Sequence, residues 1–147
     1  MSKGNATEND YVKFEANATA MPSYGANLQV NLHTADPGES GTPSSSAASY
    51  DGYAAVLVSR DSGGWTICDG TNPYGSNASG NAYKNAAQIT FPECDSGYVG
   101  TQTITHVSTS SPSTGQILRK TALTVPIVVG ALVTPLFPAG TLVFAED

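Results

Sequence analysis

The residues able to carry out acid–base, nucleophilic or metal chemistry are few and far apart in this chain. Its 147 residues include two histidines, His33 and His106, and two cysteines, Cys68 and Cys94. A zinc site needs Cys or His ligands that usually come in close pairs, and this sequence has no such pairs. The acidic residues are also scattered, whereas a calcium loop supplies oxygen ligands at short regular spacing. We therefore expect neither a metal nor another cofactor.

One short motif has the letters of a catalytic site. Arg60-Asp61-Ser62-Gly63-Gly64 contains the Asp-Ser-Gly-Gly that surrounds the nucleophile of trypsin-like proteases. That mechanism also needs a histidine base and a buried aspartate, which two β-barrels bring together. The chain before Asp61 is too short for the first barrel, and Asp and Gly are residues that a tight turn requires. We expect a hairpin turn here, and we expect that the protein is not an enzyme.

A carbohydrate-binding surface is an alternative in which the same region binds without reacting. Such a surface needs exposed aromatic side chains beside Asp or Asn, and Trp65, Asp69 and Tyr74 lie close together in the sequence. Tyr53 and Trp65 are also good candidates for the core, because large aromatic side chains contribute much buried area. Both interpretations remain open at this point.

The elements that must position these residues are strands. Short runs rich in β-branched and aromatic residues, separated by Gly, Pro, Asn and Ser, predict strands. The sequence has eight such runs, at 27–33, 53–60, 65–68, 86–91, 101–108, 116–123, 129–137 and 141–144. About eight short antiparallel strands predict an all-β fold, an antiparallel β-sandwich resembling a jelly roll.

A short helix precedes the strands. Thr7 followed by acidic residues predicts an N-cap and a first helical turn, and Tyr11, Phe14 and Ala18 then recur near one face. We expect a helix over about residues 7–17, within an N-terminal arm that comprises residues 1–24. This arm would pack on its own domain or grip a neighbour. Residues 25–147 would form a single β-sandwich domain.

The run 27–33 alternates strictly. Leu28, Val30 and Leu32 are expected to point inward, while Gln29, Asn31 and His33 face solvent. His106 shares a strand face with Ile104, so we expect a partly buried, hydrogen-bonded imidazole. The polar segments 34–49 and 69–82 predict surface loops.

Charge and hydropathy exclude two classes of partner. Six Lys and Arg stand against 12 Asp and Glu, a net charge of -6, and an acidic surface repels the phosphates of nucleic acids. The longest apolar run, 125–137, is interrupted by Pro126, Gly130 and Pro135, so we expect no membrane span. The N-terminus lacks an apolar signal segment. We therefore expect synthesis in a cytoplasm and reduced core thiols at the two cysteines, with a disulfide as the alternative.

Several stretches, in the same order and over most of the chain, carry a family resemblance. They are Leu32–Thr42, Tyr50–Ala54, Asn85–Pro92, Thr105–Val107, Gly115–Leu118 and Phe137–Leu142. With these residues the chain resembles a group of small β-rich virion proteins of tailed bacteriophages, which are often labelled tail-fibre proteins. Similar small β-sandwich proteins act as cement or decoration on capsids. The shared motifs are turns, strand ends and core positions, and none of them implies a catalytic residue.

The resemblance implies a structural protein of the virion. The leading hypothesis is a capsid cement or decoration protein on the capsid surface, with the major capsid protein and further copies of itself, as a dimer or trimer, as partners. A tail-fibre or receptor-binding component is the alternative, although the chain has no repeat from which to build a long shaft. Candidate residues for the partner interface are Lys3, Tyr11, Phe14, Tyr24, Asp36, Glu39 and Tyr74.

Overall fold

The largest sheet has five antiparallel strands. A computed structural model describes the backbone of residues 2–74 and 77–145 and the side chains of residues 3–73 and 81–145. In this part of the chain the sheet order is β1-β8-β7-β2-β3. Its strands are β1 (Ser2–Lys3), β8 (Ile117–Val129), β7 (Gln102–Ser110), β2 (Asn27–His33) and β3 (Val56–Ser59).

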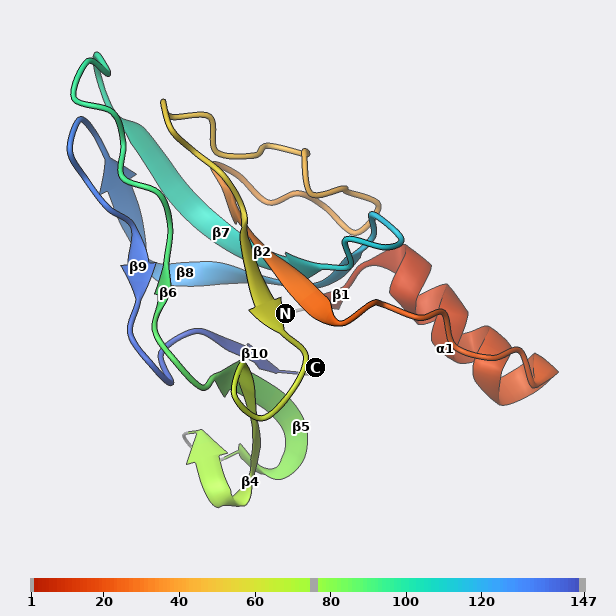
Figure 1. Cartoon of the computed structure of the whole chain (residues 1–147). Coiled ribbons are helices and arrows are strands. Elements are labelled where there is room, and N and C mark those ends of the chain that lie inside the picture. The colour runs from red at the N-terminus through yellow and green to blue at the C-terminus, as the bar shows by residue number, and fades with distance from the viewer. Residues whose placement is uncertain (1, 75–76, 146–147) are drawn as a thin grey trace.

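Two smaller antiparallel sheets complete the β body (Figure 1). One has the order β10-β5-β4, from β10 (Val143–Ala145), β5 (Asn77–Asn85) and β4 (Trp65–Tyr74). The other pairs β6 (Ile89–Thr90) with β9 (Leu136–Phe137). The prediction of an all-β, antiparallel fold with one N-terminal helix is therefore confirmed.

The core lies between these sheets. One cluster of buried side chains joins Leu28, Val30 and Ile104 of the large sheet to aromatic residues of the other strands. Phe91 contacts Phe137 edge to face, with 6.2 Å between the ring centroids, and Tyr53 packs against the same cluster. One face of the five-stranded sheet is thus covered by the two smaller sheets, which is the arrangement of a sandwich. Cys68 and Cys94 are buried free thiols, as predicted.

The helix α1 (Asn5–Asn17) begins earlier than its sequence pattern predicts. Its N-cap is Gly4, which makes no side-chain cap, so the prediction of Thr7 as N-cap is wrong. Thr7 lies within the first two turns instead, 4% exposed. Its hydroxyl donates to the carbonyl of Ile117 on β8 at 3.0 Å. This hydrogen bond satisfies the hydroxyl, which would otherwise be buried without a partner. In Figure 1 the helix extends sideways from the β body.

Two of the three polar side chains of β2 that were predicted to face solvent are buried, while Gln29 is half-buried. Asn31 and His33 are 1% and 0% exposed. The segment 34–49 folds back beside the end of β2 (Figure 1), where His33 and Ala47 form an antiparallel bridge and Ala48 N donates to Leu32 O at 2.8 Å. His33 contacts Ser45 O through Nδ1 and Ser108 Oγ through Nε2, each at 2.8 Å. Polar side chains there pair with each other, so the alternation in the sequence does not report exposure.

The turn at Asp61–Gly64 is present, but it does not form a hairpin. Asp61 O accepts hydrogen bonds from the amides of Gly64 and Trp65. The strand before it, β3, pairs with β2, and the strand after it, β4, pairs with β5. The prediction of a hairpin is therefore wrong, because the turn carries the chain from one sheet to the next.

The segment 69–82, predicted as a loop, mostly belongs to the β4–β5 hairpin. Its register shifts after Cys68 and again after Asp69, and residues 75–76 lie outside the described part. Asn and Gly weaken strand propensity, which is why the sequence pattern does not show these strands. In the C-terminal third, the predicted strand 129–137 is reduced to the two residues of β9.

Candidate functional site

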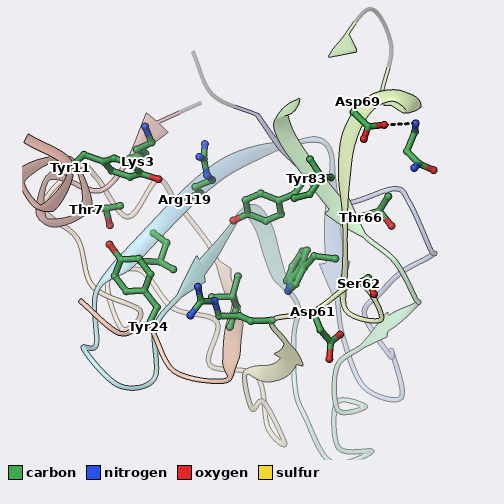
Figure 2. A pocket seen from close by; sticks show the side chains of 16 residues that line it. Lys3, Thr7, Tyr11, Tyr24, Asp61, Ser62, Thr66, Asp69, Tyr83 and Arg119 are labelled. Atoms are coloured by element: carbon green, nitrogen blue, oxygen red, sulfur yellow. Dashed lines mark hydrogen bonds between the residues drawn. The ribbon is translucent and has the colours of Figure 1, made fainter. Parts of the chain in front are cut away.

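A groove of about 860 Å³ lies between α1, the turn before β4, and the strands β4, β5 and β8. Figure 2 shows the side chains that line it. They come from segments that are distant in the sequence, since Lys3 and Arg119 sit on the paired strands β1 and β8. The fold alone brings these residues together.

Three cations line the groove, and each lies over a tyrosine ring that also lines it. The pairs are Lys3 with Tyr11 at 4.6 Å, Arg60 with Tyr24 at 5.7 Å and Arg119 with Tyr83 at 5.6 Å, measured to the ring centroid. Such contacts contribute about 0.5–1 kcal/mol each at exposed sites. Half of the six Lys and Arg residues of an acidic chain therefore gather in one groove.

Further contacts fix these cations in place. Arg60 Nη1 donates to Gly25 O at 2.8 Å, and Arg119 Nη1 donates to Ala145 O at 3.4 Å. The hydroxyl of Tyr83 lies 2.8 Å from Thr109 Oγ1. Burial raises the pKa of Tyr83 to about 12, so its hydroxyl stays neutral. These contacts hold Arg60 and Arg119 in position within the groove.

The indole of Trp65 is a donor that the described residues leave unused. The side chain is 7% exposed and lines the groove. Its ring contacts Tyr83 and Phe144 edge to face, at 5.2 and 6.2 Å. Among the described residues, none accepts a hydrogen bond from Nε1. A buried N–H of this kind requires an acceptor such as a carboxylate, a carbonyl or water.

Two acids also line the groove, and both stabilise turns. Asp61 Oδ1 accepts hydrogen bonds from the amides of Gly64 and Gly63 at 3.0 and 2.9 Å and from the Ser59 hydroxyl at 3.0 Å. Asp69 Oδ1 accepts from the amide of Thr71 at 2.8 Å and from that of Asn72 at 2.9 Å, and Figure 2 shows the second of these hydrogen bonds. These hydrogen bonds lower the pKa of both carboxyls. The Asp-Ser-Gly-Gly motif is thus a turn whose backbone amides donate hydrogen bonds to the Asp61 carboxylate.

The structure divides the candidate interface residues into separate groups. Lys3, Tyr11 and Tyr24 line the groove. Phe14 lies on α1 and is 54% exposed. Asp36 and Glu39 lie elsewhere, within 2.8 and 2.9 Å of Lys120 Nζ.

The side chain of Tyr74, also a candidate, lies outside the described part. Of the suggested carbohydrate-binding set, Trp65 lies in the core and offers no exposed ring face. Asp69 belongs to the groove. Contact of any of these residues with a partner stays a prediction.

Sequence reasoning missed Arg60, Arg119 and Tyr83. Arg60, Tyr83 and Arg119 are followed by Asp61, Lys84 and Lys120, but no local pattern relates the three residues to one another. Their shared position depends on the pairing of β8 with β1 and of β5 with β4.

Two structural observations bear on ligands and membranes. No three His, Cys, Asp or Glu residues lie together as a possible metal site anywhere in residues 2–74 and 77–145. Within the same ranges, no helix has the length and hydropathy to cross a membrane.

No curated protein matches the chain. A family model matches residues 2–145, and it describes the Podophage GP4 fiber I protein gp80. The match includes α1, all three sheets and both sides of the groove. The chain therefore belongs to this family, and it is a structural protein of a phage virion.

Proposed function

We propose that the protein is a fibre component of a podophage particle, held there by protein–protein contacts and without catalytic activity. The family match over residues 2–145 carries this proposal, because it covers the entire described fold. The alternative of a tail-fibre protein, raised by the sequence resemblance, thereby becomes the leading one.

The exposed side of α1 supports a role in attachment. Tyr11, Val12 and Phe14 are 41%, 59% and 54% exposed. Thr7 and Asn5 hold the helix to the body, Asn5 N donating to Glu39 O at 2.8 Å. Tyr11 and Phe14 are three residues apart and are therefore neighbours on the helix surface, and adjoining exposed apolar side chains of this kind mark interaction surfaces. The helix is thus both docked on its own domain and available to a neighbour.

Capsid cement is the second candidate. A fibre of this chain alone has no internal repeat from which a shaft could be built, whereas a compact β domain suits a seam between capsid subunits. The major capsid protein would then be the partner, and many weak contacts would sum over many copies.

Counting copies in purified particles separates the two candidates. Quantitative mass spectrometry against the major capsid protein is expected to give a small ratio, a few copies per particle, if the chain forms fibres. Gold-labelled antibodies should then mark one vertex of the particle. A ratio near one, or a simple fraction of one, with labelling over the entire shell would establish cement instead. Absence from purified particles would exclude both.

A further inference from the structure

We propose that the free edge of β3 binds an extended, uncharged segment of a neighbouring virion protein, which adds to the five-stranded sheet as a further strand. The proposal rests on the proposed function, because it names the kind of contact that holds the chain in the particle. It commits this edge to one occupant, a strand supplied by a different protein.

The backbone of Leu57 presents hydrogen-bonding groups on the outer edge of the sheet. Arg60 N donates to Ala26 O at 2.9 Å, which fixes the alternation of hydrogen bonds along the antiparallel pair of β2 and β3. Val56 and Val58 therefore exchange hydrogen bonds with β2, and the amide and carbonyl of Leu57 point away from it. Among the described residues, none forms a hydrogen bond with these two groups. Free groups of this kind at a sheet edge are a template for another strand.

In residues 2–74 and 77–145, β3 is the one sheet edge without a device against pairing. Edge strands of natural proteins are usually blocked by short length, charged side chains, proline or bulges. β1, β6, β9 and β10 have two or three residues each. The part of β8 beyond β1 contains Pro126 and a register shift, and β4 carries Asp69 and two register shifts. β3 instead has four uncharged residues in regular register with β2.

A slot of about 400 Å³ lies beside this edge, and we call it the β3 slot. It is lined by β3, by residues 87–90 and by Gly63 and Gly64. The turn before β4 passes so close to Ser59 O that Gly64 has no room for a side chain. The turn therefore closes the slot at the C-terminal end of β3. In Figure 1, β3 is the yellow arrow beside β2, and β6 lies in the green stretch.

The second wall of the β3 slot also has a free strand edge. Phe91 N donates to Pro135 O at 2.9 Å and Ile89 pairs with Phe137, so these two residues of the wall strand face β9. The backbone of Thr90, which lies between them, points away from β9, and Thr90 lines the slot. No described residue forms a hydrogen bond with the backbone of Thr90. An inserted strand therefore meets free donors and acceptors on both walls.

The lining of the β3 slot selects an uncharged occupant. None of the described residues that line it is charged, so a charged side chain inserted there would lose water without gaining a partner. Val56, Val58 and Ile89 pack against the core, whereas Leu57 is 58% exposed. Side chains of an added strand alternate in the same way. The fitting segment therefore has apolar, β-branched residues at alternate positions.

A strand of a second copy fits the β3 slot less well than an extended arm does. Because the slot has two walls, it accepts a strand with both edges free. In the described part of this chain, every strand already pairs with another on at least one edge. The free edge of β3 in a second copy, for example, is backed by β2. The occupant is therefore a segment that belongs to no sheet in its own protein.

Substitutions of Leu57 test the strand addition in the full-length protein. Leu57→Pro removes an N–H that points away from β2, so the protein's own sheet keeps its hydrogen bonds. Leu57→Lys introduces the charge that blocks natural edges, while Leu57→Thr retains the N–H and the strand propensity. Ile67→Lys, at a side chain that is 55% exposed on β4, is the matched control. All four variants should have the circular dichroism spectrum of the wild type.

Incorporation into particles is the measurement. Each variant replaces the wild type during infection, and mass spectrometry quantifies it in purified particles against the major capsid protein. Leu57→Thr and Ile67→Lys should match the wild type, whereas Leu57→Pro and Leu57→Lys should fall about tenfold. Leu57→Pro at the wild-type level would overturn strand addition alone. Absence of the wild-type chain from particles would overturn the proposed function, and with it the virion neighbour.

A photo-crosslinker in the wall of the β3 slot identifies the occupant. Thr90 is exposed and lines the slot, so Thr90→p-benzoylphenylalanine in purified particles should link to one uncharged segment of a different virion protein. The same crosslinker at Ile67 is the control and should not link to that segment. Links from Thr90 to β3 of a second copy would show edge-to-edge pairing of copies and overturn the assigned partner. A chain that is incorporated but forms no link from Thr90 would overturn the slot as the binding site.

Discussion

Lys120 shows how a single buried charge ties a loop to the sheet. Its side chain is 9% exposed and its Nζ lies 2.8 Å from Asp36 and 2.9 Å from Glu39. Burial lowers the pKa of Lys120, but hydrogen bonds to the two carboxylates outweigh this and raise it. Two residues suggested as partner contacts thus stabilise the domain itself.

Removing the two carboxylates should cost more than removing the lysine. Asp36→Asn/Glu39→Gln leaves a buried ammonium without its countercharges, and we expect a loss of about 2 kcal/mol in the free energy of unfolding. Lys120→Met leaves carboxylates that are 53% and 44% exposed and can be hydrated, so about 1 kcal/mol or less is expected. Urea unfolding measures both, and the reverse order would refute the argument.

His33 makes stability depend on pH. Burial lowers its pKa from the ordinary value of 6.5, so the unfolded chain binds a proton more readily than the folded one. Stability from this group is fully present above pH 6.5 and is lost as the pH falls from there toward the lowered folded pKa. The lowered pKa of Asp36, held by the hydrogen bond from Lys120, adds a further loss below its ordinary value of 3.8.

Replacing His33 should reduce the loss of stability that occurs as the pH falls below 6.5. The urea midpoint of the wild type is expected to fall as the pH drops from about 6.5 to 5. In His33→Gln this slope should shrink, whatever the absolute stability of the variant. His106→Gln should shrink the slope by less, because the charge of His106, which lies opposite His33 on β7, contributes less than burial to the lowered pKa of His33. An equal slope in His33→Gln and the wild type would show that another group is responsible.

A buried hydroxyl, that of Thr7, contributes to the attachment of the helix. Thr7 donates to Ile117 O and accepts from the side-chain amide of Gln116 at 3.2 Å. Gly4, just before the helix, passes so close to β8 that an added Cβ would lie 2.6 Å from Ile117 O. Both residues fix the angle at which α1 leaves the sheet, and therefore one wall of the groove.

Thr7→Val should loosen α1 without unfolding the β body. Valine has nearly the same shape but leaves the Ile117 carbonyl without its hydrogen bond, a loss of about 1–2 kcal/mol. Hydrogen exchange should speed up in α1 and remain slow in β7. Thr19→Val, at an exposed threonine beyond the helix, is the control. Equal exchange in α1 for both variants would contradict the proposed attachment.

The elements differ in how far the sequence predicts them. The strand 27–33 is found at its predicted bounds, because apolar alternation at one face is enforced by the core. The sequence does not predict the hairpin of β4 and β5. Its Asn, Gly and Ser residues have no strand pattern, and backbone pairing alone defines these strands. The groove could not be predicted at all, since Arg119 meets Tyr83 only through the packing of two different sheets.

In the whole molecule, Phe144 joins the small sheet to the core. It is fully buried and lies 5.4 Å from Tyr83 and 6.2 Å from Trp65, measured between ring centroids. Its strand β10 pairs with β5 and holds that hairpin against the large sheet. The position of the groove wall therefore depends on one aromatic side chain near the end of the described chain.

Phe144→Ala should lower the free energy of unfolding by about 3–5 kcal/mol, because it leaves a large cavity among rigid rings. Phe14→Ala is the matched control: the same atoms are removed from a side chain that is 54% exposed, so stability should change by less than about 0.5 kcal/mol. Thermal and urea unfolding compare them. A small loss in Phe144→Ala would show that the small sheet contributes little to the core.

The order of pairing in the large sheet has a consequence for synthesis. β1 pairs with β8, although most of the sequence lies between them, and one edge of β2 pairs with β7, which follows it far along the chain. Contacts between residues so distant in sequence make folding slow. During synthesis the N-terminal strand of each pair leaves the ribosome first. A nascent chain therefore has the unpaired edge of β2 exposed until its last third emerges. The groove, whose walls include Lys3 and Arg119, is completed only after that.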